Sequence, residues 1–109
     1  MNQTLRVVQY GCGKMSAYTM RYVFEHGGEI VGAIDKNPDV VGKDIGEMIG
    51  GNTYGVKITS VEKARELLEE ARPDAVIVTT MSLLKDCEEA LLLCAELGIN
   101  AITTCEEAF

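Results

Sequence analysis

The sequence lacks any apolar run that approaches the roughly 20 residues needed to span a bilayer. Its N-terminus also lacks the basic segment followed by an apolar segment that is typical of a signal peptide. These two absences predict a cytoplasmic protein with no membrane partner. The chain has no internal repeat and no low-complexity segment, and its 109 residues are close to the commonest size of a single domain.

Basic residues are scarce in this sequence. Ten Lys and Arg residues stand against 17 Asp and Glu residues, which gives a formal net charge of −7. Non-specific binding to nucleic acid or to an acidic membrane requires a basic surface, so this balance argues against both partners. It does not argue against a small anion that backbone amides hold locally.

The four cysteines form no C-x-x-C pair, and His26 is the only histidine. A zinc site is therefore not expected, and a reducing cytoplasm disfavours a structural disulfide. Cys87 and Cys94 lie seven residues apart on one face of a predicted helix, which is typical of small core residues. His26 precedes two glycines, where a solvated cation at a helix C-terminus is favoured over a catalytic role.

Apolar periodicity predicts a regular alternation of strands and helices. Strands are expected at residues 5–10, 29–35, 56–59, 74–80 and 99–103. Helices are expected from Lys14 to the glycines at 27–28, at 44–49 with Asp44 as N-cap, after the N-cap Ser60 up to Pro73, and at 83–97 before Gly98. The apolar stripe of the first helix is predicted to be Met15, Tyr18, Tyr22 and Val23, and that of the third to be Val61, Ala64, Leu67, Leu68 and Ala71.

Five strands interleaved with helices imply an α/β fold, an open parallel sheet of the Rossmann type with right-handed crossovers and helices on both faces. The expected strand order is 3-2-1-4-5. In such sheets ligands bind beyond the carboxyl ends of the strands, at the switch point between the first and fourth strands. Four segments of this chain are expected to converge there.

The first of these segments is a Gly-x-Gly turn between a strand and a helix. Gly11 permits a tight turn, and Gly13 lets the backbone approach phosphates where a Cβ would collide. The N-terminus of the following helix faces the anion. Ser16 replaces the third glycine of the usual fingerprint and is still small enough for close packing. We therefore predict that a dinucleotide's pyrophosphate contacts Gly11, Cys12, Gly13, Lys14 and Met15, with Cys12 present mainly for its size.

The other three segments follow the second, fourth and fifth strands. Asp35 is predicted to accept the ribose hydroxyls and to repel a 2′-phosphate, which favours NAD over NADP. Lys36 leaves NADP open because its ammonium could neutralise that phosphate, and Asp35 could instead cap a turn. Thr79 and Thr80 either line the cofactor cleft or are simply β-branched strand residues. Cys105, with Glu106 beside it, either lines the nicotinamide end or begins a domain linker.

The sequence contains no acid–base pair with a credible partner. Enzymes of this architecture often take substrate groups from a second domain, and this sequence stops directly after its fifth predicted strand. Residues 1–109 are therefore expected to form an NAD(P)-binding domain that lacks its C-terminal substrate and catalytic domain and is inactive alone. An apolar surface exposed by the missing domain could drive homo-oligomer formation.

Several strings carry a family resemblance: VQYGCGKM at 8–15, GGEIVGA at 27–33 with Ile34 and Asp35, VGKDIG at 41–46 and TTCEEAF at 103–109. The chain resembles the 2,4-diaminopentanoate dehydrogenase family and, more distantly, the N-terminal domains of dihydrodipicolinate reductases. This resemblance implies NAD(P)-dependent oxidation at a CH–NH2 group, converting a small diamino acid to 2-amino-4-oxopentanoate and ammonia during ornithine degradation. The same glycine turn and Asp35 match the family's cofactor positions. The alternatives are a dihydrodipicolinate-reductase-type enzyme and a standalone nucleotide-sensing module.

Overall fold

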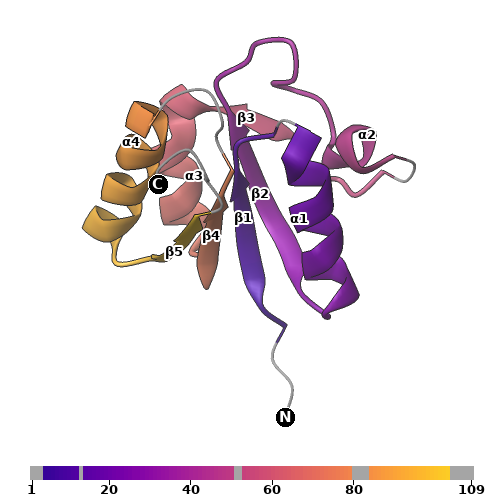
Figure 1. Cartoon of the computed structure of the whole chain (residues 1–109), viewed down its shortest axis with the longest axis horizontal. Helices are drawn as coiled ribbons and strands as arrows, with labels where there is room; N and C mark the ends of the chain where they lie inside the picture. The colour runs from indigo at the N-terminus through magenta and orange to yellow at the C-terminus, as the bar shows by residue number, and fades with distance from the viewer. Residues whose placement is uncertain (1–3, 13, 51–52, 80–83, 104–109) are drawn as a thin grey trace.

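The structure is a computed structural model that describes residues 4–12, 14–50, 53–79 and 84–103 (Figure 1). A single parallel sheet has the strand order β3-β2-β1-β4-β5, as the sequence predicted. The strands are β1 (Arg6–Tyr10), β2 (Glu29–Asp35), β3 (Ile58–Ser60), β4 (Ala75–Val78) and β5 (Asn100–Thr103). The strand boundaries move by up to two residues from those predicted, and the order does not change.

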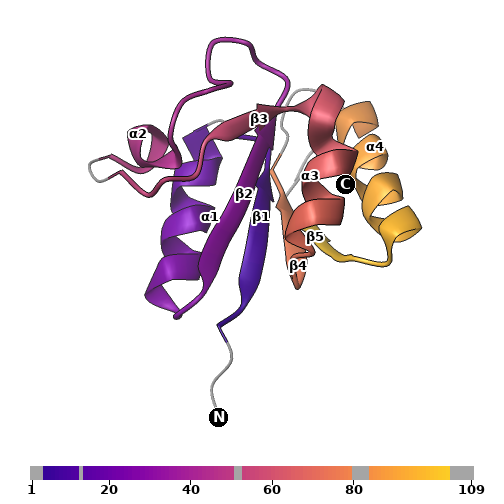
Figure 2. The same ribbon diagram turned by 180° about the vertical axis from the view of Figure 1, so that it is seen from behind.

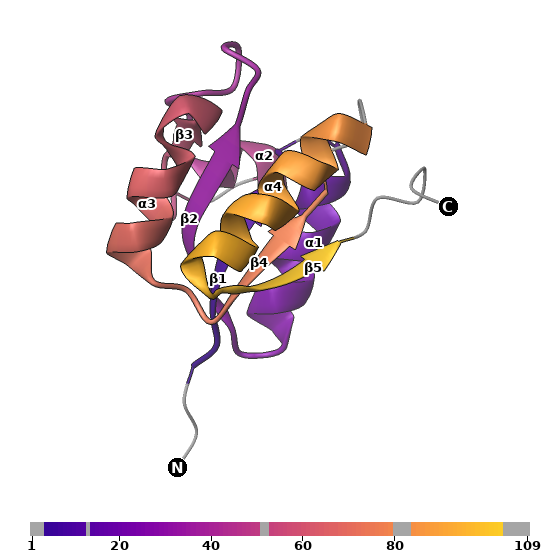
Figure 3. The same cartoon turned by 90° about the vertical axis from the view of Figure 1, so that its left-hand side faces the viewer.

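Helices cover both faces of the sheet, which confirms the predicted layers. They are α1 (Lys14–Glu25), α2 (Ile45–Ile49), the 3-10 turn η1 (Val61–Lys63), α3 (Ala64–Ala71) and α4 (Leu84–Leu97). The helices α1 and α2 lie on one face, and α3 and α4 lie on the other (Figures 1 and 2). Figure 3 shows α3 and α4 in front of the sheet with α1 behind it. Within the described ranges, no helix is long and apolar enough to cross a membrane.

Each face of the sheet has its own buried core, because successive residues of a strand point to opposite faces. On β1, Val7 packs toward α1 and α2, whereas Val8 packs toward α3 and α4, and both are fully buried. The first core also contains Met20 of α1, and the second contains Leu68 of α3. Burial on both faces explains why the strands are almost continuously apolar.

The two predicted N-caps are present. Asp44 accepts hydrogen bonds from the Gly46 N–H of α2 and from the N–H groups of Tyr54 and Gly55, which lie in the segment returning to β3. These backbone donors, first that of Tyr54 and then that of Gly46, lower the pKa of the Asp44 carboxyl. Ser60 accepts the Glu62 N–H, and the chain then makes a 3-10 turn before α3.

The predicted buried stripe of α1 was wrong at two positions. Tyr18 is 66% exposed and Tyr22 is 62% exposed, whereas Ser16 and Met20 are fully buried and Val23 is 6% exposed. Residues 16, 20 and 23 fit helical spacing as well as 15, 18 and 22 do, on a neighbouring stripe. The stripe that contains the small Ser16 allows α1 to approach the sheet closely, so it faces inward and the tyrosines face solvent.

Candidate functional site

The candidate site lies at the carboxyl edge of the sheet, where the chain leaves β1 for α1. Gly11 has a φ of 99°, a conformation that strongly favours glycine. Its N–H donates to the Ile34 carbonyl of β2 at 2.7 Å, so the turn begins tight against the neighbouring strand. On the other side of β1, the Thr79 N–H after β4 donates to the Tyr10 carbonyl at 2.9 Å. The predicted turn therefore sits at the switch point between β1 and β4.

The peptide between Gly11 and Cys12 makes hydrogen bonds at both of its ends. The Gly11 carbonyl accepts from the Gln9 Nε2 at 2.8 Å and from the Thr79 hydroxyl at 3.0 Å. The Cys12 N–H donates to Oδ2 of Asp35 at 2.7 Å. Side chains from three strand ends thus hold a single peptide group of the turn.

A buried polar cluster supports this turn from beneath. Gln9 is fully buried and Thr79 is 2% exposed. The Gln9 Nε2 also donates to the Thr79 hydroxyl at 2.7 Å, and its Oε1 accepts from the Thr19 hydroxyl of α1 at 2.7 Å. Sequence reasoning missed Gln9 and Thr19. The available signal was an amide side chain between Val8 and Tyr10, in an otherwise apolar strand directly before the glycine.

Asp35 ends β2 beside the glycine turn and is half-buried. Its Oδ2 accepts the Cys12 N–H, and its Oδ1 accepts the Asn37 N–H at 3.0 Å. The turn-capping interpretation of this residue is therefore correct. A carboxylate offers about four acceptor sites, and the residues that the structure describes use two of them. Capping fixes how the carboxylate is oriented and leaves the predicted ribose role available.

Cys12 contributes its backbone to the turn and its side chain to the core. The side chain is 1% exposed and packs in the core beneath α1, and its Sγ donates to the Ile34 carbonyl at 3.6 Å. Burial, and then the charge of Asp35, raises the pKa of the Cys12 thiol to about 12. The thiol is therefore neutral at pH 7 and is not a nucleophile. This agrees with selection of Cys12 for its size.

The other predicted site residues are described only in part. Lys14 and Met15 open α1, and only their backbone is described. Gly13, Thr80, Cys105 and Glu106 lie outside the described residues, so their predicted roles stay predictions. The Thr79 hydroxyl is occupied by the buried cluster, so it supports the turn from inside. Thr79 as a residue that touches the cofactor also stays a prediction.

His26 lies at the opposite end of α1 from the glycine turn. It is exposed, its Nδ1 lies 2.9 Å from the Tyr22 carbonyl, and its ring stacks on that of Tyr22 with centroids 4.1 Å apart. This is the helix C-terminal position that the sequence predicted. Among the residues that the structure describes, no three His, Cys, Asp or Glu side chains gather in a way that could hold a metal ion.

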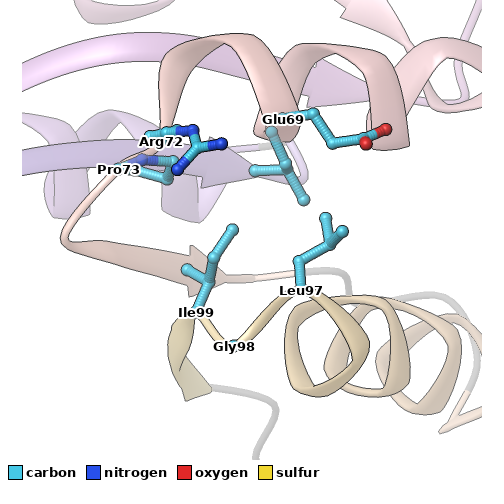
Figure 4. Close-up of a pocket in the computed structure, with 7 residues that line it drawn as sticks. Glu69, Arg72, Pro73, Leu97, Gly98 and Ile99 are labelled. Atoms are coloured by element: carbon cyan, nitrogen blue, oxygen red, sulfur yellow. The ribbon is translucent and has the colours of Figure 1, made fainter.

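The sheet's amino edge contains a cavity of about 340 Å³, between the C-terminal ends of α3 and α4. Figure 4 shows Leu97 and Ile99 pointing toward α3, while Arg72 and Glu69 come from the end of that helix. Leu68, Pro73 and Gly98 complete the lining. Arg72 and Glu69 are exposed, and no described polar side chain in this cavity is buried. The cavity is a hollow between helix ends on the far side from the glycine turn.

Comparisons with known proteins give two related matches in sequence. The chain is 31% identical over 101 residues to the 4-hydroxy-tetrahydrodipicolinate reductase of Methanosphaera stadtmanae, a match that covers 90% of this chain and 36% of the reductase. A reductase of the same name from Methanothermobacter thermautotrophicus matches to the same extent. The chain thus spans about a third of the length of these relatives. No protein-family model matches it.

Solved structures share the fold over nearly the whole chain. Amine dehydrogenase from Mycobacterium smegmatis matches with a TM-score of 0.85 and 38% identity, covering 97% of this chain and 31% of its own. RSP, a Rex-family repressor, matches with a TM-score of 0.76 and 20% identity over 95% of this chain and 46% of its own. RSP has been solved with β-NADH and with β-NAD+ and operator DNA. At that identity the likeness shows the fold alone, and the expectation of no nucleic-acid partner stays a prediction.

Together these matches establish the Rossmann-type fold and support the broader of the two predicted resemblances. The chain is similar to part of a dihydrodipicolinate-reductase-type protein and to part of an amine dehydrogenase. The finer resemblance, to 2,4-diaminopentanoate dehydrogenase, stays a hypothesis.

Proposed function

We propose that this chain binds a nicotinamide dinucleotide at the carboxyl edge of its sheet. One observation carries the proposal: a left-handed glycine turn, at Gly11, leads into α1 beside the carboxylate of Asp35. Gly11 lets the chain make this turn at a positive φ. The close approach of a phosphate to the backbone is predicted at Gly13. The first N–H groups of a helix have no partner within the helix and attract an anion.

The residues present fit this cofactor at two of its parts. The backbone at the start of α1 would face the pyrophosphate. The acceptor sites of Asp35 that the described residues do not use would receive the ribose hydroxyls, and its negative charge would repel a 2′-phosphate, which favours NAD. NADP remains the alternative, because the family resemblance implies either cofactor and Lys36 directly follows Asp35.

We further propose that residues 1–109 are the cofactor domain of an oxidoreductase that acts on a CH–NH2 group. When bound, the nicotinamide would accept a hydride from the carbon that bears the amino group. The resulting imine would hydrolyse to a ketone and ammonia, and for 2,4-diaminopentanoate the product is 2-amino-4-oxopentanoate. The likeness to amine dehydrogenase, at 38% identity, favours this reaction class. The substrate groups would come from polypeptide outside this chain.

The second candidate is a dihydrodipicolinate-reductase-type activity on a cyclic substrate. The sequence matches to two reductases of that type favour it. Reading the coding frame past Phe109 and assaying the resulting protein against 2,4-diaminopentanoate and dihydrodipicolinate separates the two. Activity only on the cyclic substrate would replace the first candidate with the second.

Binding of NADH to this chain tests the central proposal. The chain has no tryptophan, so nicotinamide fluorescence can be followed without an indole background. We expect saturable binding. An L-residue disfavours a φ of 99° by on the order of 1–2 kcal/mol, so the turn in Gly11→Ala should leave its binding geometry and the affinity should fall about tenfold or more. Circular dichroism of the variant checks that it is folded. If fluorescence and calorimetry both show no saturable binding of NADH by the wild-type chain, the proposal is wrong.

A further inference from the structure

Hydrogen bonds of the Gly11–Cys12 peptide link the buried side chains of Gln9 and Thr79 to the carboxylate of Asp35. Its carbonyl is held by the side chains of Gln9 and Thr79, at 2.8 and 3.0 Å. Its N–H is held by Oδ2 of Asp35 at 2.7 Å. Because a peptide group is planar, its carbonyl and N–H point in opposite directions, so fixing the oxygen also fixes the direction of the N–H.

The two side chains that donate to the Gly11 carbonyl are fixed by burial and by further hydrogen bonds. Gln9 and Thr79 lie on neighbouring strand ends, are 0% and 2% exposed, and bond to each other at 2.7 Å. The Gly11 carbonyl can only accept, so the Gln9 Nε2 must face the turn, and the Gln9 Oε1 then accepts from the Thr19 hydroxyl. Residues from β1, α1 and the end of β4 therefore set one peptide orientation.

The orientation of the Asp35 carboxylate depends on that peptide. Its two oxygens are held by two backbone donors, the Cys12 N–H at 2.7 Å and the Asn37 N–H at 3.0 Å. If the peptide is released, one of these two donors leaves, and the carboxylate can rotate away from a single position. Discrimination against a 2′-phosphate depends on where that negative charge lies.

We propose that Gln9 and Thr79 are positioning residues that set the preference for NAD over NADP through the peptide that they hold. They hold the Gly11–Cys12 peptide, and the peptide holds Asp35. This inference rests on the proposed dinucleotide binding. It predicts that removing the buried donors changes the ratio of the two affinities, whereas a general loss of stability would lower both affinities equally.

The test uses substitutions that remove the hydrogen bonds and keep the volume. Gln9→Leu deletes the amide donors, and Thr79→Val replaces the hydroxyl with a methyl group, leaving a buried carbonyl less satisfied. Dissociation constants for NADH and NADPH are measured for each variant. We expect NADH affinity to fall about fivefold, NADPH affinity to fall less, and the NADPH-to-NADH ratio of dissociation constants to shrink by about threefold, within the range expected for a lost buried hydrogen bond.

Two matched variants separate positioning from stability. Thr79→Ser keeps the hydroxyl and should keep the wild-type ratio. Val76→Ala opens a small cavity on the same strand, in the core toward α3 and α4, away from the turn. It should lower thermal stability and leave the ratio unchanged. Unfolding curves for all variants identify a temperature at which each is folded.

The outcomes distinguish the two levels of the proposal. If the wild-type chain binds NADH but Gln9→Leu and Thr79→Val keep its ratio, the positioning role is wrong and the proposed function stands. If the wild-type chain binds neither nucleotide, the proposed function fails and the selectivity role fails with it. Hydrogen exchange of the Cys12 amide is a readout without ligand: it should be faster in Thr79→Val than in Thr79→Ser. Equal exchange rates in the two variants would mean that the Thr79 hydroxyl does not hold the Gly11–Cys12 peptide.

Discussion

The two edges of the sheet place their polar groups in opposite ways. At the carboxyl edge, Gln9 and Thr79 are buried and bond to each other and to the backbone of the turn. At the amino edge the cavity of about 340 Å³ is lined by aliphatic side chains together with Arg72 and Glu69, and both of these charged residues are exposed. Burying polar groups costs free energy unless their hydrogen bonds are made, so the buried cluster at the carboxyl edge indicates a functional site with a fixed geometry. The volume of the cavity at the amino edge does not indicate a functional site.

Each edge also contains a residue with positive φ, and the residue types differ. Gly11 at the carboxyl edge has a φ of 99°, and Arg72 at the amino edge has a φ of 45° as the C-cap of α3. The left-handed helical region near +57° tolerates an L-residue at a modest cost, whereas values near +100° lie beyond it. The turn that precedes α1 therefore requires glycine more strictly than the turn that ends α3.

The largest expected effect comes from removing the acid at the carboxyl edge. In Asp35→Ala the Cys12 N–H loses its acceptor and the proposed ribose contact disappears, so NADH affinity should fall by about tenfold or more, the equivalent of about 1.4 kcal/mol. The matched control is Glu69→Ala at the amino edge, which removes one exposed acid there and should leave NADH affinity unchanged. Fluorescence titration measures both. Equal effects of the two variants would remove the distinction between the edges.

A smaller effect is expected from the Cys12 thiol, which is buried beneath the turn. Its pKa in the folded protein is about 12, above the ordinary value of 9.0, so folding favours the protonated form. That stabilisation is fully present below pH 9 and is lost as the pH rises from 9 toward 12. At pH 10 the loss should be about 1 kcal/mol relative to pH 8. Urea unfolding of the wild type and of Cys12→Ala at both pH values measures how much of the loss in unfolding free energy comes from the Cys12 thiol.

The comparison between wild type and Cys12→Ala is needed because other groups also titrate above pH 9. Burial raises the pKa of Cys94 in the opposite core as well, and that group is unchanged in the variant. Cys12→Ala should be less stable than wild type at pH 8, because it leaves a cavity, but should lose less stability on going to pH 10. Parallel losses in the two proteins would mean that the thiol ionises without a penalty in the fold.

Apolar periodicity was sufficient to predict the strands and helices, because each of them has a local pattern. The strand order followed from the topology rules for alternating strands and helices. The glycine turn and Asp35 were likewise visible as residue types at strand ends. Tyr18 and Tyr22 were mispredicted because helical spacing gives the period of a stripe but not which stripe faces the sheet. That choice depends on packing against strands, and here the close approach at Ser16 decided it.

The buried cluster could not be predicted from local sequence. Gln9 and Thr79 are 70 residues apart in the chain, and their contact exists only because β1 and β4 are neighbours in the sheet. A polar residue in an apolar strand indicates that a partner is needed but does not identify it. Sequence patterns therefore locate the turn, whereas the hydrogen bonds that orient it require the three-dimensional fold.

The smallest expected effect tests the amino edge alone. Arg72→Gly relieves the left-handed strain at the end of α3 but increases the freedom of the unfolded chain, so we expect a net gain in unfolding free energy of about 0.5 kcal/mol or less.

The opposite substitution is Gly98→Ala on the same edge, where φ is 70° and no atom lies within 4 Å of the added Cβ. It should lose about 1 kcal/mol through backbone strain alone. Neither variant should change NADH affinity, since neither reaches the Gly11 turn. A change in affinity from either would mean that the two edges are coupled through the sheet, and the contrast between them would then be one of degree.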